Sequence, residues 1–304
     1  MKRYLELCRF PAVFTALADV LLGFVLAGGT VDTPRDRLSL GLACSAGLYL
    51  GGMVLNDILD RRRDASERPG RPIPSGRVSV RAAGLFYFLL TSGGLLAAAG
   101  GGRTMLALAA AVATCVALYD GPLKRTPAGP AMMGACRFGN VLIGAAAGGA
   151  GWRLWAEPSL LAEPRVMSAA ALLAVYITGL TVFARTEAVT SRRWRLVAGA
   201  VLVNAALVGV VAWSVVFRGG GRAVVALAGV GAIALVINRR LAAAMRSPQP
   251  PTVGRAVKLM ILSIPVVDAC LIAFAAGASG AGWAVACAML VLPAATAGRV
   301  LKLT

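Results

Sequence analysis

Residues 38–64 read LSLGLACSAGLYLGGMVLNDILDRRRD, and this stretch decides the fold class. Its first part, residues 38–59, is a predominantly apolar run, and its last residues are a mixture of aspartates and arginines. A helix of about 20 apolar residues is long enough to cross the ~30 Å hydrocarbon core of a bilayer. The stretch therefore predicts a membrane-spanning helix that leaves the bilayer into a dense cluster of charged side chains.

Similar apolar runs occupy most of the remaining chain. Of its 304 residues 58% are hydrophobic, only 14% are charged and none is histidine, whereas soluble domains carry about 25% charged residues. The runs are continuous and do not alternate between apolar and polar residues, which excludes a transmembrane β-barrel. We expect an all-α polytopic membrane protein with nine or ten transmembrane helices and, because the connections are short, a single domain over residues 1–304. The ten candidate spans are residues 11–29, 38–59, 82–100, 103–119, 131–151, 168–185, 196–217, 223–238, 257–276 and 281–300.

The basic residues orient the expected bundle. The formal net charge is +18, but only 6% of the residues are aromatic and the basic residues flank the apolar runs, so membrane lipids and not nucleic acid are the expected partner. The connections after the second, fourth, sixth and eighth spans are basic, whereas the intervening ones are nearly neutral. Basic connections stay in the cytoplasm, so we expect an integral multi-pass protein of the cell (inner) membrane whose charged cluster faces the cytoplasm. A count of nine spans would instead place Arg299 and Lys302 on the opposite side.

Three aspartates in the charged cluster have helical spacing. Asp57, Asp60 and Asp64 stand at i, i+3 and i+7, which places their carboxylates on one face of a continuing helix. Three like charges at a membrane boundary are costly unless a cation holds them together, and an oxygen-only ligand set favours a hard ion such as Mg²⁺. The alternative is a solvated acidic helix end that is neutralised by the arginines at 61–63.

Residues 67–77, ERPGRPIPSGR, follow the aspartates directly. Two guanidinium groups, those of Arg68 and Arg71, lie in a turn that three prolines stiffen, and arginine is suited to bidentate binding of phosphate oxygens. Carboxylates for Mg²⁺ beside fixed arginines form the arrangement that a diphosphate leaving group requires, because the cations neutralise the charge that grows as the carbon–oxygen bond breaks.

The string NDILDRRRD, followed by ERPGRPIPSGRVS, resembles the first aspartate-rich motif of the UbiA superfamily of intramembrane prenyltransferases. The resemblance implies a helical bundle around a central cavity that is open to lipid, with Mg²⁺ as cofactor. It also implies that a prenyl group passes from a prenyl diphosphate to an aromatic or other small or lipophilic acceptor. A catalytically silent homologue, which binds or transports an isoprenoid or a small metabolite, is the alternative function.

The resemblance also implies roles for individual residues. Asp57, Asp60 and Asp64 would hold Mg²⁺ and act in catalysis, and Asn56, Arg68 and Arg71 would lie near the diphosphate. Residues 119–125, YDGPLKR, are similar to the family's Tyr-x(4)-Lys segment, which makes Lys124 a catalytic diphosphate contact and Tyr119 a substrate-binding residue near the allylic cation. An interfacial aromatic residue and a snorkelling lysine are the alternatives for these two positions.

The second aspartate-rich motif of the family is absent from the corresponding stretch. Residues 181–193 read TVFARTEAVTSRR, with one carboxylate, Glu187, and three arginines. In one interpretation Glu187 still binds the metal as a catalytic residue and Arg185 supplies the missing positive charge to the substrate. In the other, ionisation is impaired and the bundle is the silent homologue. The ARTE version of this stretch resembles the EboC-type branch of the superfamily.

Two further features concern the packing of the spans. Asp19, Arg137, Asn140 and Asp268 lie inside apolar runs, where polar groups are costly and face the bundle interior. We expect Asn140 to line the cavity and bind substrate, with a hydrogen bond between helices as the alternative. The glycine-rich segments 47–52 and 144–151 predict close helix–helix contact.

Overall fold

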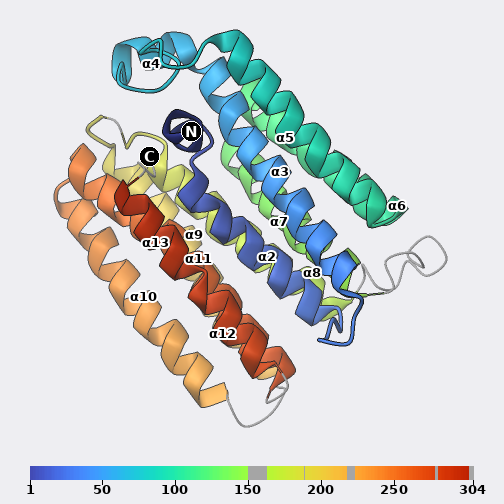
Figure 1. Cartoon of the computed structure of the whole chain (residues 1–304). Coiled ribbons are helices and arrows are strands. Elements are labelled where there is room, and N and C mark those ends of the chain that lie inside the picture. The colour runs from blue at the N-terminus through green and yellow to red at the C-terminus, as the bar shows by residue number, and fades with distance from the viewer. Residues whose placement is uncertain (150–162, 188, 218–222, 278–279, 301–304) are drawn as a thin grey trace.

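The computed structural model describes residues 1–149, 163–187, 189–217, 223–277 and 280–300. Every regular element in these ranges is a helix, and the long helices pack side by side in one bundle (Figure 1). Eight of the described helices are long and apolar enough to cross a membrane, and Phe10–Leu26 is a shorter apolar helix. The all-α polytopic fold is therefore confirmed. The end of the expected span 131–151 and Lys302 lie outside the described residues.

The helices match the predicted runs in order. Their bounds are α1 Lys2–Leu7, η1 Phe10–Ala12, α2 Val13–Leu26, α3 Arg35–Leu59, α4 Arg61–Glu67, α5 Val80–Gly100, α6 Arg103–Leu118, η2 Tyr119–Leu123, α7 Gly129–Gly148, α8 Pro164–Ala184, α9 Arg193–Val216, α10 Ala223–Arg246, α11 Pro250–Ala276, α12 Ala281–Met289 and α13 Val291–Val300.

The largest differences from the predicted ranges lie at helix ends. The helix α10 continues to Arg246, past the expected end at 238, and α11 begins at Pro250, before the expected start at 257. An apolar run marks the hydrocarbon core, whereas the helix itself continues into the interface, where long basic side chains reach water. The expected span 281–300 is two helices that meet at Leu290, three residues before Pro293, whose ring nitrogen has no N–H to continue the ladder of the preceding helix.

The aspartate-rich stretch is one helix only in part. The helix α3 ends at Leu59 and α4 begins at Arg61, so that Asp60 is the residue between them. Backbone hydrogen bonds nevertheless cross the break, from the Asp60 N–H to the Asn56 carbonyl (2.9 Å) and from the Asp64 N–H to the Asp60 carbonyl (2.9 Å). The expected single continuing helix is therefore corrected to two helices, and the chain keeps an almost helical course through the break.

Glycines bring the backbones of α2 and α7 into direct contact. A Cβ atom added to Gly144 would lie 2.1 Å from the carbonyl oxygen of Val20, and one added to Gly148 would lie 2.1 Å from that of Phe24. Gly47 of α3 has the same relation to α5, with the carbonyl oxygen of Leu90 2.6 Å from the added Cβ. The predicted close packing at both described glycine-rich segments is confirmed, and it places the polar residues of α2 opposite those of α7.

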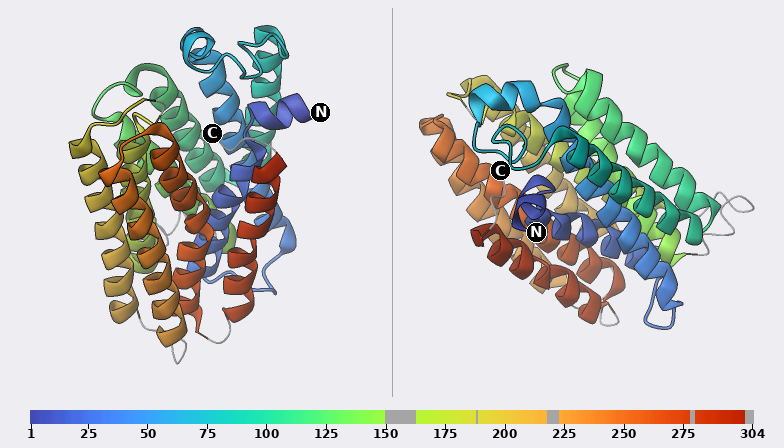
Figure 2. Two further views of the ribbon diagram at one scale, coloured as in Figure 1. Left: turned by 90° about the vertical axis from the view of Figure 1, so that its left-hand side faces the viewer. Right: turned by 45° about the horizontal axis from the view of Figure 1, so that its top comes forward.

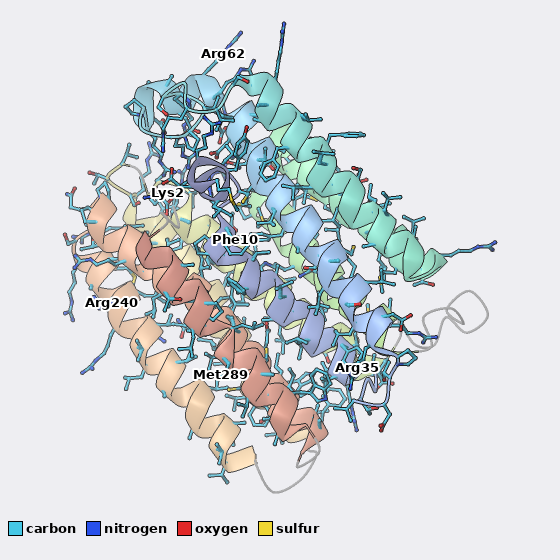
Figure 3. All side chains as sticks on the ribbon, in the orientation of Figure 1. Lys2, Phe10, Arg35, Arg62, Arg240 and Met289 are labelled. Carbon is cyan, nitrogen blue, oxygen red and sulfur yellow. The ribbon has the colours of Figure 1, made fainter. Side chains whose placement is uncertain are left out.

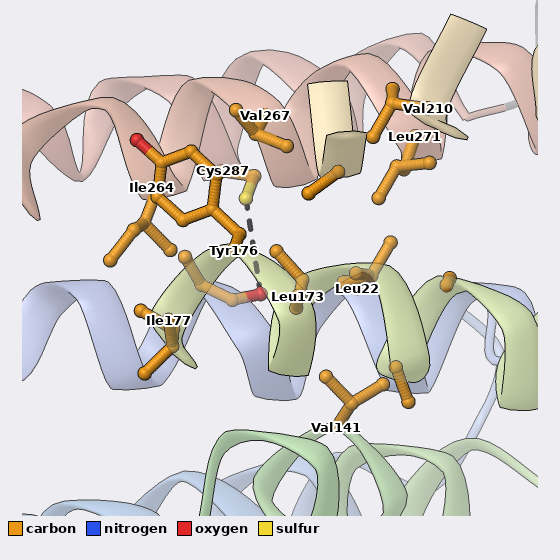
Figure 4. Packing of buried hydrophobic residues seen from close by; sticks show 14 of the residues in the cluster. Leu22, Val141, Leu173, Tyr176, Ile177, Val210, Ile264, Val267, Leu271 and Cys287 are labelled. Atoms are coloured by element: carbon orange, nitrogen blue, oxygen red, sulfur yellow. Dashed lines mark hydrogen bonds between the residues drawn. The ribbon is translucent and has the colours of Figure 1, made fainter. Parts of the chain in front are cut away.

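Much of the interior beside α2 is apolar. Leu22 of α2, Val141 of α7, Leu173 of α8 and Leu271 of α11 are buried in one cluster (Figure 4). The side chain of Tyr176 also lies in this cluster, and its hydroxyl donates to the carbonyl of Met260 (3.1 Å). This packing fixes α2, α7, α8 and α11 relative to one another.

A cap forms at one end of the bundle. The helices α1 and α4 lie at the same end in both views of Figure 2, and a small apolar cluster that includes Leu7, Val54, Ile73 and Val78 attaches α1 and the turn after α4 to α3. Arg62 marks this end in Figure 3, and Arg35, the first residue of α3, lies at the opposite end. The aspartates at the end of α3 are thus covered by the cap.

Replacing Gly144 with alanine tests the packing between α2 and α7. We expect the free energy of unfolding to fall by about 1–3 kcal/mol, because the added methyl group forces two backbones apart. Chemical denaturation in detergent measures the change. The matched control is Gly231→Ala on α10, where an added Cβ meets nothing within 4 Å. Equal stability of the two variants would contradict the close contact.

Candidate active site

A cavity of about 550 Å³ lies between α3, α6, α7 and α8. Along the helices its walls are mostly apolar, with side chains such as those of Val112, Ile177 and Ile264. Under the cap its walls are charged. The charged residues there are Arg9, Asp60, Arg63, Asp64, Glu67, Arg68, Arg71, Asp120, Lys124, Arg125, Arg185, Glu187 and Arg195. A molecule with a polar head and a hydrocarbon tail matches this division of the walls.

Arg71 joins two of the three aspartates. Its Nη1 donates to Oδ1 of Asp57 (3.1 Å) and to Oδ2 of Asp64 (2.6 Å), and Nη2 of Arg9 donates to the same oxygen of Asp57 (3.2 Å). The proline-rich turn returns Arg71 to the aspartates, and the turn is closed by a hydrogen bond from the Val78 N–H to the Pro72 carbonyl (3.0 Å). Burial, and next the positive charge of Arg9, lower the pKa of Arg71 from its usual value.

Lys124 joins the third aspartate to a fourth one. Its Nζ donates to Oδ2 of Asp60 and lies 3.8 Å from Oδ1 of Asp120. Nδ2 of Asn56 donates to the same oxygen of Asp120 (2.7 Å). The π-helical turn η2, whose Gly121 departs from helical angles, bends the chain so that Lys124 faces α3. Tyr119 at the start of this turn lines the cavity, and Nζ of Lys124 lies 6.0 Å from the centre of its ring.

The residues after α8 line the charged part of the cavity, the charged wall, on the side opposite to α3. Oε1 of Glu187 accepts a hydrogen bond from Nη2 of Arg68 (3.2 Å), which links this side to the turn after α4. The other oxygen of Glu187, Oε2, is buried and has no hydrogen-bond partner in the part of the chain that the structure describes. Arg185 donates to the backbone carbonyl of Arg125. Glu187 therefore has one oxygen free for a further ligand.

The carboxylates are paired with basic side chains in this structure. Among the described residues no three acidic, thiol or imidazole groups are close enough together to hold a metal ion. Asp57, Asp60 and Asp64 instead each contact an arginine or lysine. The donor set still fits Mg²⁺ together with a diphosphate, because it consists of oxygen atoms and because the basic groups that now neutralise it are those that bind phosphate oxygens.

Nearly all of the predicted site residues lie in this cavity. Its walls contain Asn56, Asp60, Asp64, Arg68, Arg71, Tyr119, Lys124, Asn140, Arg185 and Glu187. Asp57 instead lines a second cavity, which Arg9, Arg68 and Arg71 also line. Asn140 lies away from the aspartate-rich stretch 57–64. Its side-chain amide donates hydrogen bonds to the Ala16 carbonyl (2.8 Å) and to Oδ2 of Asp19 (3.0 Å).

Arg9 and Asp120 form hydrogen bonds with predicted site residues through their side chains but were not themselves predicted. Arg9 lies at the break between α1 and η1, with a left-handed φ of 47° that is uncommon for a residue other than glycine. Asp120 stands four residues before Lys124 in the segment YDGPLKR. A carboxylate one helical turn from the predicted lysine could therefore have indicated that Asp120 belongs to the site. Arg9 could have been recognised as a site residue only from its place as a basic residue directly before the first apolar run.

Comparison with known proteins identifies relatives of the chain. A model of the UbiA prenyltransferase family matches residues 16–262. The protein named digeranylgeranylglyceryl phosphate synthase is 34% identical in Methanopyrus kandleri, over 47% of this chain and 48% of that protein. The protein of that name in Methanoculleus marisnigri is 31% identical, over 48% of each chain. The chain thus spans about half the length of the curated relatives it matches.

Solved structures show the same fold. A UbiA homologue from Aeropyrum pernix has a TM-score of 0.69 at 20% identity, covering 86% of this chain and 96% of that one. A UbiA homologue from Archaeoglobus fulgidus, bound to GPP and Mg²⁺, has a TM-score of 0.65 at 16% identity, covering 94% and 99%. Because the family model matches well over half of the sequence, the chain belongs to the UbiA prenyltransferase family.

Proposed function

We propose that this protein is a Mg²⁺-dependent intramembrane prenyltransferase that passes a prenyl group from a prenyl diphosphate to a small or lipophilic acceptor. One observation carries the proposal: Asp60, Asp64 and the basic side chains around them line one end of a cavity whose other walls are mostly apolar, and Asp57 lines an adjoining cavity that shares Arg9, Arg68 and Arg71 with it. The diphosphate belongs at the charged end and the prenyl chain against the apolar walls. The solved relative bound to GPP and Mg²⁺ supports a prenyl diphosphate as the donor and Mg²⁺ as the ion.

The aspartates are the groups that would hold Mg²⁺. Bound there, the ion would neutralise charge on the diphosphate. Arg71 and Lys124, which now contact Asp57, Asp64 and Asp60, are within reach of the same place and would transfer their hydrogen bonds to diphosphate oxygens. Their positive charges stabilise the leaving group as the carbon–oxygen bond breaks.

The apolar walls protect the carbocation that remains. Side chains such as Val116, Leu180 and Ile261 offer no nucleophile and exclude water. The chain contains no histidine. The proton that leaves the acceptor therefore goes to a carboxylate, to water or to the released diphosphate.

The altered stretch after α8 bears on whether the protein is active. Glu187 has one free buried oxygen at the charged wall, and Arg185 lines the same wall. We propose that Glu187 adds a ligand to the metal site and that Arg185 replaces part of the missing positive charge. The second candidate function is a silent homologue that binds an isoprenoid, and it is favoured by the pairing of Glu187 with Arg68.

We further propose that the protein lies in the cell membrane with the cap in the cytoplasm. The connections that form the charged end, including the turn after α4 and the residues around Lys124, are the basic ones. Basic connections remain on the cytoplasmic side. Water-soluble diphosphate would then leave directly into the cytoplasm.

An assay in lipid nanodiscs tests the function. Labelled geranyl, farnesyl and geranylgeranyl diphosphates are incubated with the protein, Mg²⁺ and a lipid extract of the native host, and prenylated products are detected by mass. We expect at least one donor to give a product and release of diphosphate, and chelation of Mg²⁺ with EDTA to stop both. Mg²⁺-dependent binding of the donors without release of diphosphate would identify the silent homologue instead.

A further inference from the structure

A buried cluster of charged residues lies deeper in the bundle than Asp57, Asp60 and Asp64. Arg137 of α7 donates from Nη1 to Oδ2 of Asp19 on α2 (2.8 Å) and from Nη2 to Oγ1 of Thr15 (2.8 Å). Asp268 of α11 lies near Asp19, and both of its carboxylate oxygens are buried without a hydrogen-bond partner among the described residues. Asp19, Thr15 and Asp268 are 0% exposed and Arg137 is 8% exposed. The reaction proposed above uses none of these residues.

The guanidinium group of Arg137 has unused hydrogen-bond donors. Arg137 lines the cavity, whereas Asp19 and Asp268 do not. A guanidinium has five N–H groups, and the bonds to Asp19 and Thr15 are its only hydrogen bonds to residues that the structure describes. One face of the group lies over the ring of Tyr49, 5.6 Å from the ring centre. Contacts with Asp19, Thr15 and Tyr49 therefore hold the guanidinium in place at the cavity wall, and its remaining N–H groups have no hydrogen-bond partner among the described residues.

The position excludes the diphosphate as the partner of these donors. Tyr49 precedes Asn56 by seven residues on α3, which is about 10 Å along a helix. Arg137 thus lies about two helical turns below the charged wall. The prenyl chain offers no hydrogen-bond acceptor, and a buried donor left against hydrocarbon is costly. The remaining occupant of the cavity is the acceptor.

We propose that Arg137, oriented by Asp19 and Thr15, recognises the acceptor by donating hydrogen bonds to one of its oxygen atoms, and that this oxygen belongs to an uncharged group such as a carbonyl or hydroxyl. The proposal rests on the proposed function, because it assigns the second substrate of that reaction. The positive charge of Arg137 is balanced by Asp19, and a second carboxyl group, that of Asp268, lies nearby. The cluster therefore offers hydrogen-bond donors without an excess of positive charge, which disfavours a carboxylate or phosphate at this depth.

The variant must avoid leaving Asp19 charged and unpaired, because a buried carboxylate without its partner destabilises the fold strongly. The test variant is therefore the double substitution Asp19→Asn and Arg137→Met. The matched control is Asp268→Asn, which changes a buried carboxyl group of the same cluster that does not reach the cavity. Thermal unfolding of both variants checks that they remain folded.

Three labelled probes of similar shape test the chemistry without turnover. Binding of 1,4-naphthoquinone, naphthalene and 1-naphthoate to protein in nanodiscs is measured by equilibrium dialysis, with empty nanodiscs subtracted. We expect the wild-type protein and Asp268→Asn to bind 1,4-naphthoquinone about tenfold or more tightly than naphthalene, and the double variant to lose this difference. Equal binding of the two probes by the wild-type protein, or an unchanged difference in the double variant, would overturn the proposal. Tighter binding of 1-naphthoate than of 1,4-naphthoquinone would overturn the assignment to an uncharged oxygen.

Turnover separates this inference from the function on which it rests. With the native lipid extract as acceptor, the double variant is expected to need about tenfold more extract for half-maximal rate, while its half-maximal geranyl diphosphate concentration stays within about twofold. A rise in the geranyl diphosphate requirement alone would assign Arg137 to the donor and overturn the proposal. Absence of any wild-type product would count against the proposed function, while the probe binding would still decide the role of Arg137.

Discussion

Replacing Asp60 with alanine is expected to abolish the release of diphosphate. The carboxylate is one of the oxygen ligands proposed for Mg²⁺, and it also positions Lys124 at the charged wall. The substitution removes one proposed ligand of Mg²⁺ and leaves Lys124 without its closest partner. Both changes weaken the stabilisation of the diphosphate leaving group. We expect a rate loss on the order of 1000-fold, the equivalent of about 4 kcal/mol in the transition state.

Diphosphate release with geranyl diphosphate and native lipid extract measures this effect. Asp36→Ala is the matched control, because Asp36 is an exposed carboxylate in the first turn of the same helix, at the end far from the site. Asp60→Asn separates charge from shape and is expected to resemble Asp60→Ala. Turnover of Asp60→Ala within about tenfold of the wild-type rate would remove this residue from the metal site.

The order of the apolar helices was predictable because a bilayer-spanning helix leaves a local record in the sequence, whereas the predicted nine or ten spans compare with eight described helices that are long and apolar enough to cross a membrane and one shorter apolar helix. Each run of apolar residues between charged connections corresponds to a helix or, at 281–300, to a pair of short ones. The ends were less predictable, since α10 continues through Arg239 and Arg240 to Arg246 although these residues are not apolar. The break at Asp60 was also missed, because neither glycine nor proline marks it in the sequence.

The site was predictable where its residues are neighbours in sequence. Asn56, Asp60 and Asp64 lie four residues apart on successive turns of an almost continuous helical course. Their spacing alone therefore predicted that they lie together. Arg9 and Asp120 join the site only through the packing of distant elements. The pair of Asp19 and Arg137 likewise depends on the glycine contact between α2 and α7, which sequence spacing cannot reveal.

Replacing Arg71 with methionine is expected to make the stability of the protein depend on Mg²⁺. Arg71 is the cation that Asp57 and Asp64 share, and all three side chains are largely buried. Removing it leaves two buried carboxylates without this partner, which costs about 3–5 kcal/mol of unfolding free energy. The same change frees their oxygen atoms for a divalent ion. A ligand that binds only the folded state at 100 times its dissociation constant adds about 2.7 kcal/mol, so Mg²⁺ should recover much of the loss.

Thermal unfolding with MgCl₂, and with KCl at equal ionic strength to account for screening, measures this dependence. We expect Arg71→Met to unfold at a lower temperature than the wild-type protein without Mg²⁺ and to gain more from its addition, because in the wild-type protein the ion must displace the guanidinium. Arg62→Met, which removes an exposed arginine of α4, is the control and should show neither effect. The double variant Arg71→Met with Asp64→Asn should lose most of the gain, because it lacks one of the oxygen ligands. If Mg²⁺ stabilises Arg71→Met no more than the wild-type protein, the basic groups that contact the aspartates do not stand in for a metal ion, and the pairing of these charges is structural.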